Sequence, residues 1–345
     1  MSGCVVAICG ATGIVGREFV RILEQRNFPL RELRLLASER SAGKQSLTFG
    51  GEALPVQATT RQAFRGVEIA LFSAGAGVSR EMATLAAAEG AVVVDNSSAW
   101  RMDPAVPLVV PEINAEDIRE HRGIIANPNC STIQMVVALN PLHRANPLRR
   151  VIVDTYQSVS GAGGKGIDEL NEQTAAVLAG RPARVEVQPR RIAFNVIPHV
   201  DVPMDDGYYR EEWKMIHETR KIMHLPALPV SATCVRVPVA IGHSEAVHAE
   251  FERPLSPAEA RALLAEAPGI ALIDNPAEAL YPLPVEAAGR DEVFVGRIRR
   301  DASHPNGLAL WVVSDNVRKG AALNAVQIAE RVVSGRSAIG DQQSA

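Results

Sequence analysis

Short apolar runs alternate with helix-like segments along the first 130 or so residues of the chain. Because these runs are almost continuously apolar, they are typical of parallel strands that are buried on both faces of a sheet. Residues 14–26 have apolar side chains at helical spacing, and a second helix is predicted near residues 79–89. The pattern predicts an α/β domain in which helices cover a parallel sheet. The predicted strands are residues 5–9, 33–37, 68–73, 91–95, 108–110 and 124–126.

The pattern changes after about residue 150, where the predicted strands become longer and alternate between apolar and polar residues. Such strands are typical of an antiparallel sheet with one packed face. Helices are expected at residues 166–178, 209–223 and 257–266, the last with a capping box formed by Ser256 and Glu259. This half is therefore predicted to be an α+β domain with a mostly antiparallel sheet. Its predicted strands are residues 151–158, 233–241, 246–252, 293–299 and 308–313.

The C-terminal segment, residues 316–333, is amphipathic and carries one apolar stripe. We expect it to form a helix that packs back on the first domain. The first domain is thus predicted to contain residues 1–130 and a helix at about residues 316–335, and the second domain residues 131–315. The stripe consists of Val317, Ala321, Ala325, Ile328, Ala329 and Val332.

Composition excludes several classes of protein. The chain has 345 residues, of which 22% are charged and 47% apolar, and its formal net charge is −3. This length suits two domains, and the charge offers no basic surface for nucleic acid. No apolar run approaches the roughly 18 residues of a membrane span, and the N-terminus lacks the basic segment of a signal peptide. We expect no nucleic-acid or membrane partner, a cytoplasmic location and, from the cysteine spacing, no metal site.

A glycine-rich turn, residues 10–16, follows the first predicted strand and begins the first predicted helix. Its glycines permit a tight turn and the close approach of a pyrophosphate to the helix N-terminus. The spacing is GxxGxxG rather than GxGxxG, so a turn that serves only packing is the alternative. The alternation of strands and helices favours a Rossmann-like dinucleotide-binding domain. The candidate cofactor contacts here are Gly10, Thr12, Gly13, Ile14, Val15 and Gly16.

The end of the second predicted strand bears on which dinucleotide binds. NAD sites commonly place an acidic residue about 20 residues after the glycine turn. Here Arg40 lies between Ser38 and Ser41, and a guanidinium with two hydroxyls suits the 2′-phosphate of NADP. Glu39 favours NAD unless it points outward, and a solvated basic loop is a further alternative. We favour NADP, with Ser73, in a second glycine-containing turn, as another candidate contact.

Cys130 lies in the segment NPNCST, between a short apolar run and a predicted helix. Ser131 and Thr132, which follow it, are residue types that favour a helix N-cap. A thiolate at a helix N-terminus is stabilised by the helix dipole, and free N–H groups there also stabilise an oxyanion. The alternative is a buried, inert cysteine, which is the interpretation for Cys4, Cys9 and Cys234. The polar neighbours of Cys130 favour a nucleophile.

A proton partner for this thiol is suggested by the segment RVPVAIGHS, residues 236–244. His243 follows a glycine at the end of an apolar run, where a bend exposes the imidazole. Arg236 lies in the same apolar stretch, and a buried arginine requires a carboxylate or phosphate partner, whether a ligand or an internal salt bridge. Regular strand geometry does not place the two side chains on one face, so a bend near Gly242 is required.

Eight segments together resemble the aspartate-β-semialdehyde dehydrogenases, in family order and over essentially the whole chain. Relatives of this architecture include N-acetyl-γ-glutamyl-phosphate reductases and glyceraldehyde-3-phosphate dehydrogenases. The resemblance implies that the first domain binds NADP and that the second is catalytic and forms the interface of a homodimer or homotetramer. The segments are GATGIVG (10–16), SERSAGK (38–44), SSAWRM (97–102), NPNCST (127–132), TYQSVSGAGGKG (155–166), EEWKM (211–215), RVPVAIGHS (236–244) and DNVRKGAA (315–322).

The resemblance implies roles for the matching residues. Cys130 is implied to be the acyl-forming nucleophile, His243 the acid/base, and Gln157 the residue that orients the substrate and intermediate. Arg236 is implied to bind the substrate carboxylate and Glu211 its amino group. The other implied substrate contacts are Arg101 and Lys214, which hold phosphate, and Asn129.

Without the resemblance, Glu211 and Lys214, three residues apart on a predicted helix, form no more than a surface ion pair. Ser160, Gly161 and Asn316 match cofactor contacts on the nicotinamide side. Trp100 stands where the family has Phe, which leaves the implied chemistry unchanged.

The implied reaction is the reversible, NADPH-dependent reductive dephosphorylation of L-aspartyl 4-phosphate to L-aspartate 4-semialdehyde through a cysteine thioester. It serves the biosynthesis of lysine, through diaminopimelate, and of threonine, methionine and isoleucine. One alternative is an N-acetyl-γ-glutamyl-phosphate or acyl-CoA reductase with the same chemistry. Another is a non-catalytic nucleotide-binding homologue.

Overall fold

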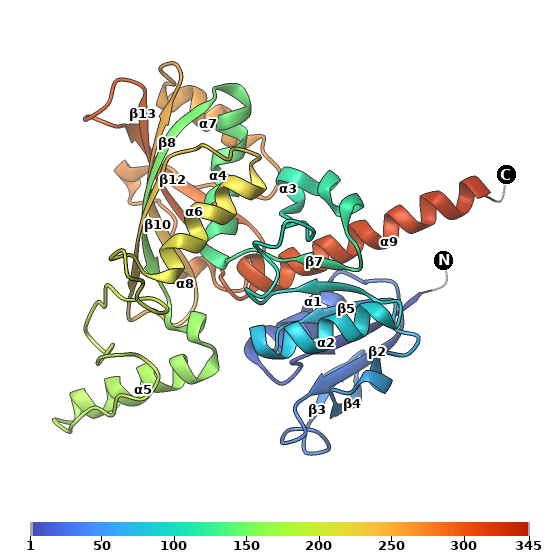
Figure 1. The fold of residues 1–345 in the computed structure, drawn as a ribbon. Coiled ribbons are helices and arrows are strands. Elements are labelled where there is room, and N and C mark those ends of the chain that lie inside the picture. Colours follow the sequence, from blue (N-terminus) through green and yellow to red (C-terminus); the bar gives the residue numbers. More distant parts are fainter. Residues whose placement is uncertain (1–2, 344–345) are drawn as a thin grey trace. The chain divides into compact units, whose positions relative to one another are not determined.

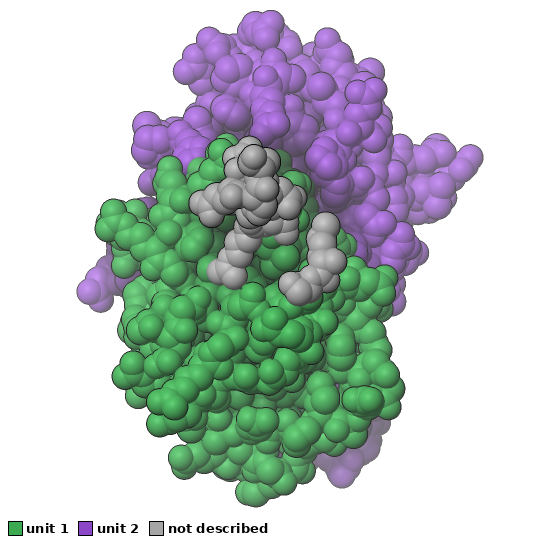
Figure 2. Space-filling view, turned by 90° about the vertical axis from the view of Figure 1, so that its right-hand side faces the viewer, with its two compact units in different colours: residues 1–128, 321–345 green, residues 129–320 purple. Residues whose placement is uncertain are grey.

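The computed structural model describes residues 3–343, with the backbone alone for residues 336–343. The chain forms two compact units, residues 1–128 with 321–345 and residues 129–320, which are coloured separately in Figure 2. We call these unit 1 and unit 2. Each unit is built around one large sheet. Within the described part of the chain, no helix has the length and apolar character needed to cross a bilayer.

Unit 1 contains a seven-stranded sheet with the order β3-β4-β2-β1-β5-β6-β7. Its neighbouring strands are parallel, except for β3 and β4. The strand order reverses at β1, and ligands of such sheets bind beyond the carboxyl ends of the strands at this switch point. The strands are β1 (Cys4–Cys9), β2 (Leu30–Ala37), β3 (Ser46–Phe49), β4 (Glu52–Ala58), β5 (Ile69–Phe72), β6 (Val92–Asp95) and β7 (Ile124–Ala126).

Two details of this sheet differ from the sequence-based prediction. Residues 108–110 were predicted to form a strand, but only an isolated bridge joins Leu108 to Ala126. The hairpin of β3 and β4 was not predicted, although the positive φ angles of Gly50 and Gly51 are those that a tight hairpin turn requires. The Gly50-Gly51 dipeptide was the sequence signal from which this hairpin could have been predicted.

Helices cover both faces of this sheet. Helices α1 (Ile14–Gln25) and α9 (Leu323–Gln343) contact each other, and their apolar residues share one core with β1, β2, β5 and β6. Helix α2 (Ala76–Ala88) packs on β5, β6 and β7. The crossover from β1 to β2 through α1 and the crossover from β5 to β6 through α2 run in opposite directions across the sheet, so right-handed connections place the two helices on opposite faces. The short elements are α3 (Pro111–Asn114), η1 (Arg61–Phe64) and η2 (Ala115–Glu120).

The C-terminal helix begins later than predicted. Residues 318–322 form a π-helical turn, and α9 starts only at Leu323. Its contacts with α1, β5 and β6 bring the end of the chain back to the N-terminal sheet.

Unit 2 contains a six-stranded sheet with the order β11-β12-β13-β10-β8-β9. The three central pairs are antiparallel, and the two outer pairs are parallel. The predicted fold class, a parallel α/β sheet followed by a mostly antiparallel one, is confirmed. The strands are β8 (Leu148–Gln157), β9 (Val230–Arg236), β10 (His243–Phe251), β11 (Ile270–Leu272), β12 (Val293–Arg300) and β13 (Gly307–Ser314).

Three helices lie together on one side of this sheet, as Figure 1 shows: α4 (Cys130–Ala145), α6 (Arg210–Ile222) and α7 (Pro257–Ala265). The predicted capping box of α7 is confirmed. Ser256 Oγ accepts the Glu259 N–H at 3.2 Å, and the Glu259 carboxylate accepts the Ser256 N–H at 2.8 Å. The remaining elements are α5 (Gly164–Leu178), α8 (Pro284–Ala287), η3 (Val159–Ala162) and η4 (Pro276–Glu278).

Strand register places a buried carboxyl group beneath α4. Glu245 pairs with Thr155 across β10 and β8, and it is fully buried. In the described part of the chain, no hydrogen bond satisfies its two oxygen atoms. Burial raises the pKa of Glu245 well above its ordinary value, and the nearby Gln134 amide opposes this rise only in part. Burial therefore favours the protonated form of Glu245 in the folded protein.

Substitution of Glu245 by Gln tests this protonation state. The folded protein keeps a proton that the unfolded chain releases above its pKa of about 4.5. The free energy of unfolding of the wild type should therefore fall by up to about 1.4 kcal/mol per pH unit above that value because of this group. Glu245→Gln should remove this slope and be the more stable protein at pH 7, as measured by urea unfolding between pH 5 and 8. The exposed Glu266→Gln is the matched control and should leave the slope unchanged; parallel curves for wild type and Glu245→Gln would contradict the assignment.

Candidate active site

Three of the predicted site residues lie in one row across the six-stranded sheet. Gln157 of β8 pairs with Arg236 of β9, and the pairing of Ser244 with Tyr156 places His243 of β10 beside Gln157 on its other side. The row lies at the ends of these strands, on the face covered by α4. Register thus brings together an amide, a guanidinium and an imidazole that are far apart in the sequence.

A change of direction between β9 and β10 makes this row possible. Strand β9 ends at Arg236 rather than at residue 241 as predicted, and β10 begins at His243. Gly242 has a φ of 97°, and a Cβ atom there would lie 2.8 Å from Pro284. The bend that the sequence requires near Gly242 is therefore present.

Cys130 is the first residue of α4, and its N-cap is Asn129. The sequence analysis favours Ser131 and Thr132 as cap residues, and this detail is wrong. The Asn129 Oδ1 atom accepts the N–H groups of Ser131 and Thr132, at 3.0 and 3.2 Å. Cys130 itself is partly exposed. The thiol is therefore carried by the first turn of a helix that begins immediately before it.

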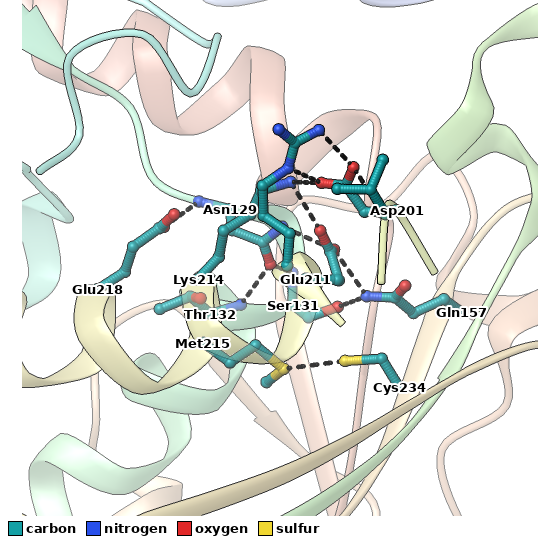
Figure 3. A network of polar contacts seen from close by, with 12 residues as sticks. Asn129, Ser131, Thr132, Gln157, Asp201, Glu211, Lys214, Met215, Glu218 and Cys234 are labelled. Carbon is teal, nitrogen blue, oxygen red and sulfur yellow. Dashed lines mark hydrogen bonds and ion pairs between the residues drawn. The ribbon is translucent and has the colours of Figure 1, made fainter. Parts of the chain in front are cut away.

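The N-cap residue is held from two sides, as Figure 3 shows. The Asn129 N–H donates to Glu218 at 2.6 Å, and its side-chain amide donates to Glu211 at 2.8 Å. Both carboxylates belong to α6, and their spacing of seven residues puts them on the same helix face. Glu218 was not singled out in the sequence analysis, although this spacing was a usable signal.

Gln157 links the same carboxylate to α4. Its Nε2 atom donates to Ser131 Oγ at 2.6 Å and to Glu211 Oε1 at 3.1 Å. Its Oε1 atom is buried and has no partner in the described part of the chain. The amide is thereby fixed in orientation, with its oxygen left available.

Glu211 and Lys214 form an ion pair at 2.9 Å, but not the surface pair considered as the alternative. Glu211 is 6% exposed. Burial would raise the pKa of Glu211, but Lys214 and the hydrogen bonds from Asn129 and Gln157 lower it to about 2. The carboxylate is therefore ionised at neutral pH. Lys214 also bonds to Asp201, a residue that the sequence analysis does not identify.

Arg236 is buried without an ionic partner among the residues that the structure describes. It is 7% exposed; its Nη1 atom donates to the Ser158 carbonyl at 2.7 Å, and its Nε atom has no partner. Burial lowers the pKa of Arg236, and the negative charge of Glu211 opposes this effect. The internal salt bridge considered as the alternative is not found. Donor capacity remains for an anionic ligand.

His243 is buried and neutral. Burial and the charge of Arg236 lower its pKa to about 3, against the opposing effect of Glu211. Its Nδ1 atom accepts the Ser158 N–H at 3.0 Å, so the proton of the neutral ring lies on Nε2. The Nε2 atom has no hydrogen-bond partner in the described residues. The imidazole is thus held in one tautomer, with an N–H group to donate.

The residues predicted to contact the nicotinamide lie in the same network. Asn316 Oδ1 accepts hydrogen bonds from Ser158 Oγ at 3.0 Å, Ser160 Oγ at 3.1 Å and the Gly242 N–H at 2.9 Å. A Cβ atom at Gly161 would lie 2.7 Å from Arg236 Nη1. Asn316 is therefore linked to His243 through the Ser158 hydroxyl, and Gly161 packs against the Arg236 guanidinium.

A glycine beside the thiol was missed in the sequence analysis. A Cβ atom at Gly320 would lie 2.8 Å from the Cβ atom of Cys130. The absence of a side chain at this position leaves room for the thiol. The residue falls within the matched segment 315–322, which was the available signal.

The glycine turn of unit 1 has the geometry that an anion site requires. Gly10 has a φ of 90°, and a Cβ atom there would lie 2.4 Å from the Ser73 carbonyl oxygen. A Cβ atom at Gly16 would lie 2.2 Å from the Gly10 carbonyl oxygen, whereas Gly13 has ordinary room. Gly13 is the N-cap of α1, and no side chain caps this helix or places an acid in its first turn. The free end suits a pyrophosphate, and Thr12, Ile14 and Val15 belong to the same turn.

The loop after β2 is exposed at Ser38, Glu39 and Arg40, and partly buried at Ser41. Arg40 has no hydrogen-bond or ion-pair partner in the described structure. The loop therefore offers a free guanidinium with hydroxyl groups nearby, and Glu39 also lies at the surface.

Arg101 lies in unit 1, in a buried polar cluster at the end of β6. It is 8% exposed, and its Nη2 atom donates to the Asn96 carbonyl at 2.8 Å. Trp100 Nε1 donates to Ser79 Oγ, which in turn donates to the buried Asp95. The indole N–H thus has a specific partner, which accounts physically for tryptophan at this position. Arg101 belongs to unit 1, whereas Lys214 belongs to unit 2.

The other three cysteines are buried, as predicted. Cys4 is 7% exposed, and Cys9 and Cys234 are each 1% exposed. Burial raises the pKa of Cys9 to about 11 and that of Cys234 well above its ordinary value. The thiols of Cys9 and Cys234 are therefore protonated at neutral pH, and Cys130 is the cysteine with more solvent access than the other three.

Comparisons with known proteins agree with this geometry. Residues 5–121 match the semialdehyde dehydrogenase NAD-binding domain, and residues 139–319 match the semialdehyde dehydrogenase dimerisation domain. A nucleotide-binding domain of the NAD(P) type and an oligomeric protein follow from these two matches.

Similar proteins cover nearly the whole chain. The aspartate-semialdehyde dehydrogenases of Aquifex aeolicus and Bacillus subtilis are 58% and 54% identical, and each alignment covers 95% of this chain and 97% of the relative. A crystal structure of aspartate semialdehyde dehydrogenase II from Vibrio cholerae, complexed with ASA, has a TM-score of 0.94 at 51% identity and covers 97% of this chain and 99% of its own. The enzyme of Candida albicans, solved with NADP, has a TM-score of 0.74 at 26% identity, over 96% and 98% of the two chains. The family inferred from the sequence motifs is therefore confirmed, and the chain belongs to the aspartate-semialdehyde dehydrogenases.

Proposed function

We propose that this protein reduces L-aspartyl 4-phosphate to L-aspartate 4-semialdehyde with NADPH, reversibly, through a thioester on Cys130. The observation that carries the proposal is the position of Cys130 on the first turn of α4, next to the row of Gln157, Arg236 and His243. The N-terminus of α4 and the charge of Arg236 favour the thiolate. Thiolate attack on the acyl carbon breaks the bond to phosphate and forms the thioester.

Two charged groups select the amino-acid part of the substrate. Arg236 presents a buried guanidinium without an anion, which suits the α-carboxylate. Glu211 is ionised and suits the ammonium group. An N-acetylated substrate would leave this buried carboxylate without a cation from the ligand, which disfavours N-acetyl-γ-glutamyl phosphate. Asn129 lies beside Glu211 and contributes an amide to the same recess.

Lys214 holds the phosphate in this proposal, and Arg101 is the second phosphate ligand that the family resemblance implies. Lys214 is held by Glu211 at 2.9 Å, so the sites for the amino group and the phosphate are adjacent. The Gln157 amide lies between Glu211 and α4, where it orients the acyl group.

His243 acts as the acid/base. Ser158 fixes the tautomer with the proton on Nε2, and this N–H donates to the sulfur or to the oxygen that becomes negative. Collapse of the tetrahedral thiohemiacetal then releases the aldehyde and regenerates the Cys130 thiolate.

The cofactor is NADP rather than NAD in this proposal. The bound nicotinamide supplies the hydride that reduces the thioester. The uncapped N-terminus of α1 suits the pyrophosphate, and Arg40 with Ser38 and Ser41 suits the 2′-phosphate. The Candida albicans relative, which was solved with NADP, supports this choice.

The oligomer is a homodimer, or a tetramer built from such dimers, and the interface lies on the side of the six-stranded sheet opposite α4. Side chains on that side alternate with those of the active-site row. Tyr156 and Trp311 contact each other there with ring centroids 5.4 Å apart, next to a pocket lined partly by Leu283. Tyr156 and Leu283 are 39% and 37% exposed, which is unusual for such residues unless a partner covers them.

In the cell, the reaction supplies aspartate semialdehyde for the biosynthesis of lysine, threonine, methionine and isoleucine. The assay that tests the activity is phosphate-dependent reduction of NADP with aspartate semialdehyde, run in parallel with NAD. A non-catalytic nucleotide-binding homologue would be inactive with both dinucleotides.

The first prediction of this proposal concerns the nucleophile. Cys130→Ser should lower turnover by about a thousandfold or more, because a serine hydroxyl is not ionised at neutral pH. NADPH binding, measured by fluorescence titration, should be retained. Cys4→Ser is the control and should keep normal turnover, and a normal rate for Cys130→Ser would exclude the thioester mechanism.

The second prediction concerns the carboxylate site. Arg236→Lys keeps the positive charge but loses the fork of donors, so KM for aspartate semialdehyde should rise about tenfold or more. Steady-state kinetics at saturating NADP and phosphate measures this effect. Arg149→Lys, at an exposed ion pair of the same unit, should leave KM unchanged. An unchanged KM for Arg236→Lys would remove Arg236 from the carboxylate site.

The third prediction concerns the dinucleotide. Arg40→Ala should raise KM for NADP about tenfold while KM for NAD stays the same, because only NADP carries the 2′-phosphate. Arg331→Ala, an exposed arginine on α9, is the control. Equal effects of Arg40→Ala on the two dinucleotides would argue against a 2′-phosphate contact.

A further inference from the structure

Four side chains of alternating charge form a chain at the start of α6. Arg210 donates to Asp201 through Nε at 3.0 Å and Nη2 at 2.7 Å. Lys214 Nζ donates to Asp201 Oδ2 at 2.6 Å and to Glu211 Oε2 at 2.9 Å. The order is therefore cation, anion, cation, anion, and it runs from the exposed Arg210 to the buried Glu211. Figure 3 labels the last three of these residues, Asp201, Lys214 and Glu211.

Asp201 is held firmly in this chain. Its φ is 70°, a left-handed conformation that few residues other than Gly, Asn and Asp adopt readily. Its Oδ1 atom also accepts the Val202 N–H at 2.9 Å. Burial would raise the pKa of Asp201, but the hydrogen bonds and charges of Arg210 and Lys214 hold it well below its usual range. The carboxylate is therefore fixed and ionised in the absence of any ligand.

The two carboxylates that contact Lys214 differ in their other hydrogen-bond partners. Glu211 also accepts hydrogen bonds from Asn129 and Gln157, so its position is fixed by the residues around the thiol. Among the described residues, the bonds of Asp201 reach that network only through Lys214. Its shorter bond to Lys214 takes one of the three N–H donors of the ammonium group and offsets the positive charge that attracts phosphate.

We infer that Asp201 is a resident anion that competes with phosphate for Lys214 and thereby weakens phosphate binding. This inference rests on the proposed role of Lys214 as a phosphate ligand. A carboxylate on the same chain is always present at its binding position, so it displaces phosphate without diffusing to the site. Arg210 moderates the competition, because each proton it donates to Asp201 draws negative charge away from Lys214.

The consequence concerns the release of phosphate after the thioester has formed. In the reductive direction, phosphate leaves before the thioester is reduced, and a lysine opposed by Glu211 alone would retain it more tightly. Asp201 replaces phosphate on the ammonium group as phosphate departs, so Lys214 regains its second carboxylate partner. Weak phosphate binding therefore follows from a carboxylate that touches neither the substrate nor the thiol.

The central test is Asp201→Asn. Asparagine also adopts positive φ, so the backbone conformation should persist. KM for inorganic phosphate in the oxidative direction should fall about fivefold, and phosphate should inhibit the reductive direction about fivefold more strongly, as expected when one partly buried opposing charge is removed.

Arg210→Met is the matched variant. Arg210 is exposed, and its replacement breaks the Arg210–Asp201 ion pair from the other side. It leaves the Asp201 charge wholly to Lys214, so KM for phosphate should rise, also about fivefold. A merely structural role of the pair would shift both variants in the same direction. Opposite shifts support the inference; shifts in one direction, or unchanged values, overturn it. If Asp201→Asn did not fold, a lowered or unchanged KM in Arg210→Met would by itself overturn the inference.

Lys214→Met separates this inference from the proposed function. If it leaves KM for phosphate unchanged, Lys214 is not a phosphate ligand, and the assignment of the phosphate site fails together with the inference. If it raises KM strongly while Asp201→Asn and Arg210→Met have no effect, the phosphate site stands and only the competition by Asp201 is excluded.

Discussion

The cap on helix α4 is the interaction on which the rest of the site depends. Asn129 satisfies the N–H groups of Ser131 and Thr132, and this bond determines where the helix begins. Two carboxylates of α6 hold Asn129 in turn. A capping residue commonly contributes about 1 kcal/mol to helix stability, but here it also sets the position of the residue that follows it, Cys130. The geometry of the thiol is thus a consequence of how α4 and α6 pack.

Much of the fold followed from periodicity, because long buried strands and amphipathic helices leave strong patterns. Strand ends were less predictable, since they depend on tertiary contacts. Strand β9 stops at Arg236, six residues before the bend at Gly242, and residues 108–110 are apolar without joining a sheet as a strand. Apolar composition alone cannot distinguish a strand from a buried irregular segment.

Sequence motifs indicated which residues belong to the candidate site. The way in which strand pairing arranges these residues was less predictable. The motifs identified Cys130, Gln157, Arg236 and His243, but only strand register shows that the last three form one row. Asp201 had no signal, because it lies in an irregular segment and acquires its partners through the fold. Motifs mark the positions of Gly161 and Gly320, but only the structure shows why a side chain does not fit there, because the reason is a neighbouring atom of Arg236 or Cys130.

The separation of the site residues along the chain has a consequence for how the protein matures. Strands β8 and β9 are adjacent and parallel, yet residues 158–229 lie between them, and Gly320 must reach Cys130 from the far end of the unit. Contacts between such distant segments form slowly, because long loops have to close first. During synthesis on the ribosome, Cys130 emerges long before the arginine, the histidine and the acidic residues of the same site. The surroundings of the thiol are therefore complete only when the whole unit has folded.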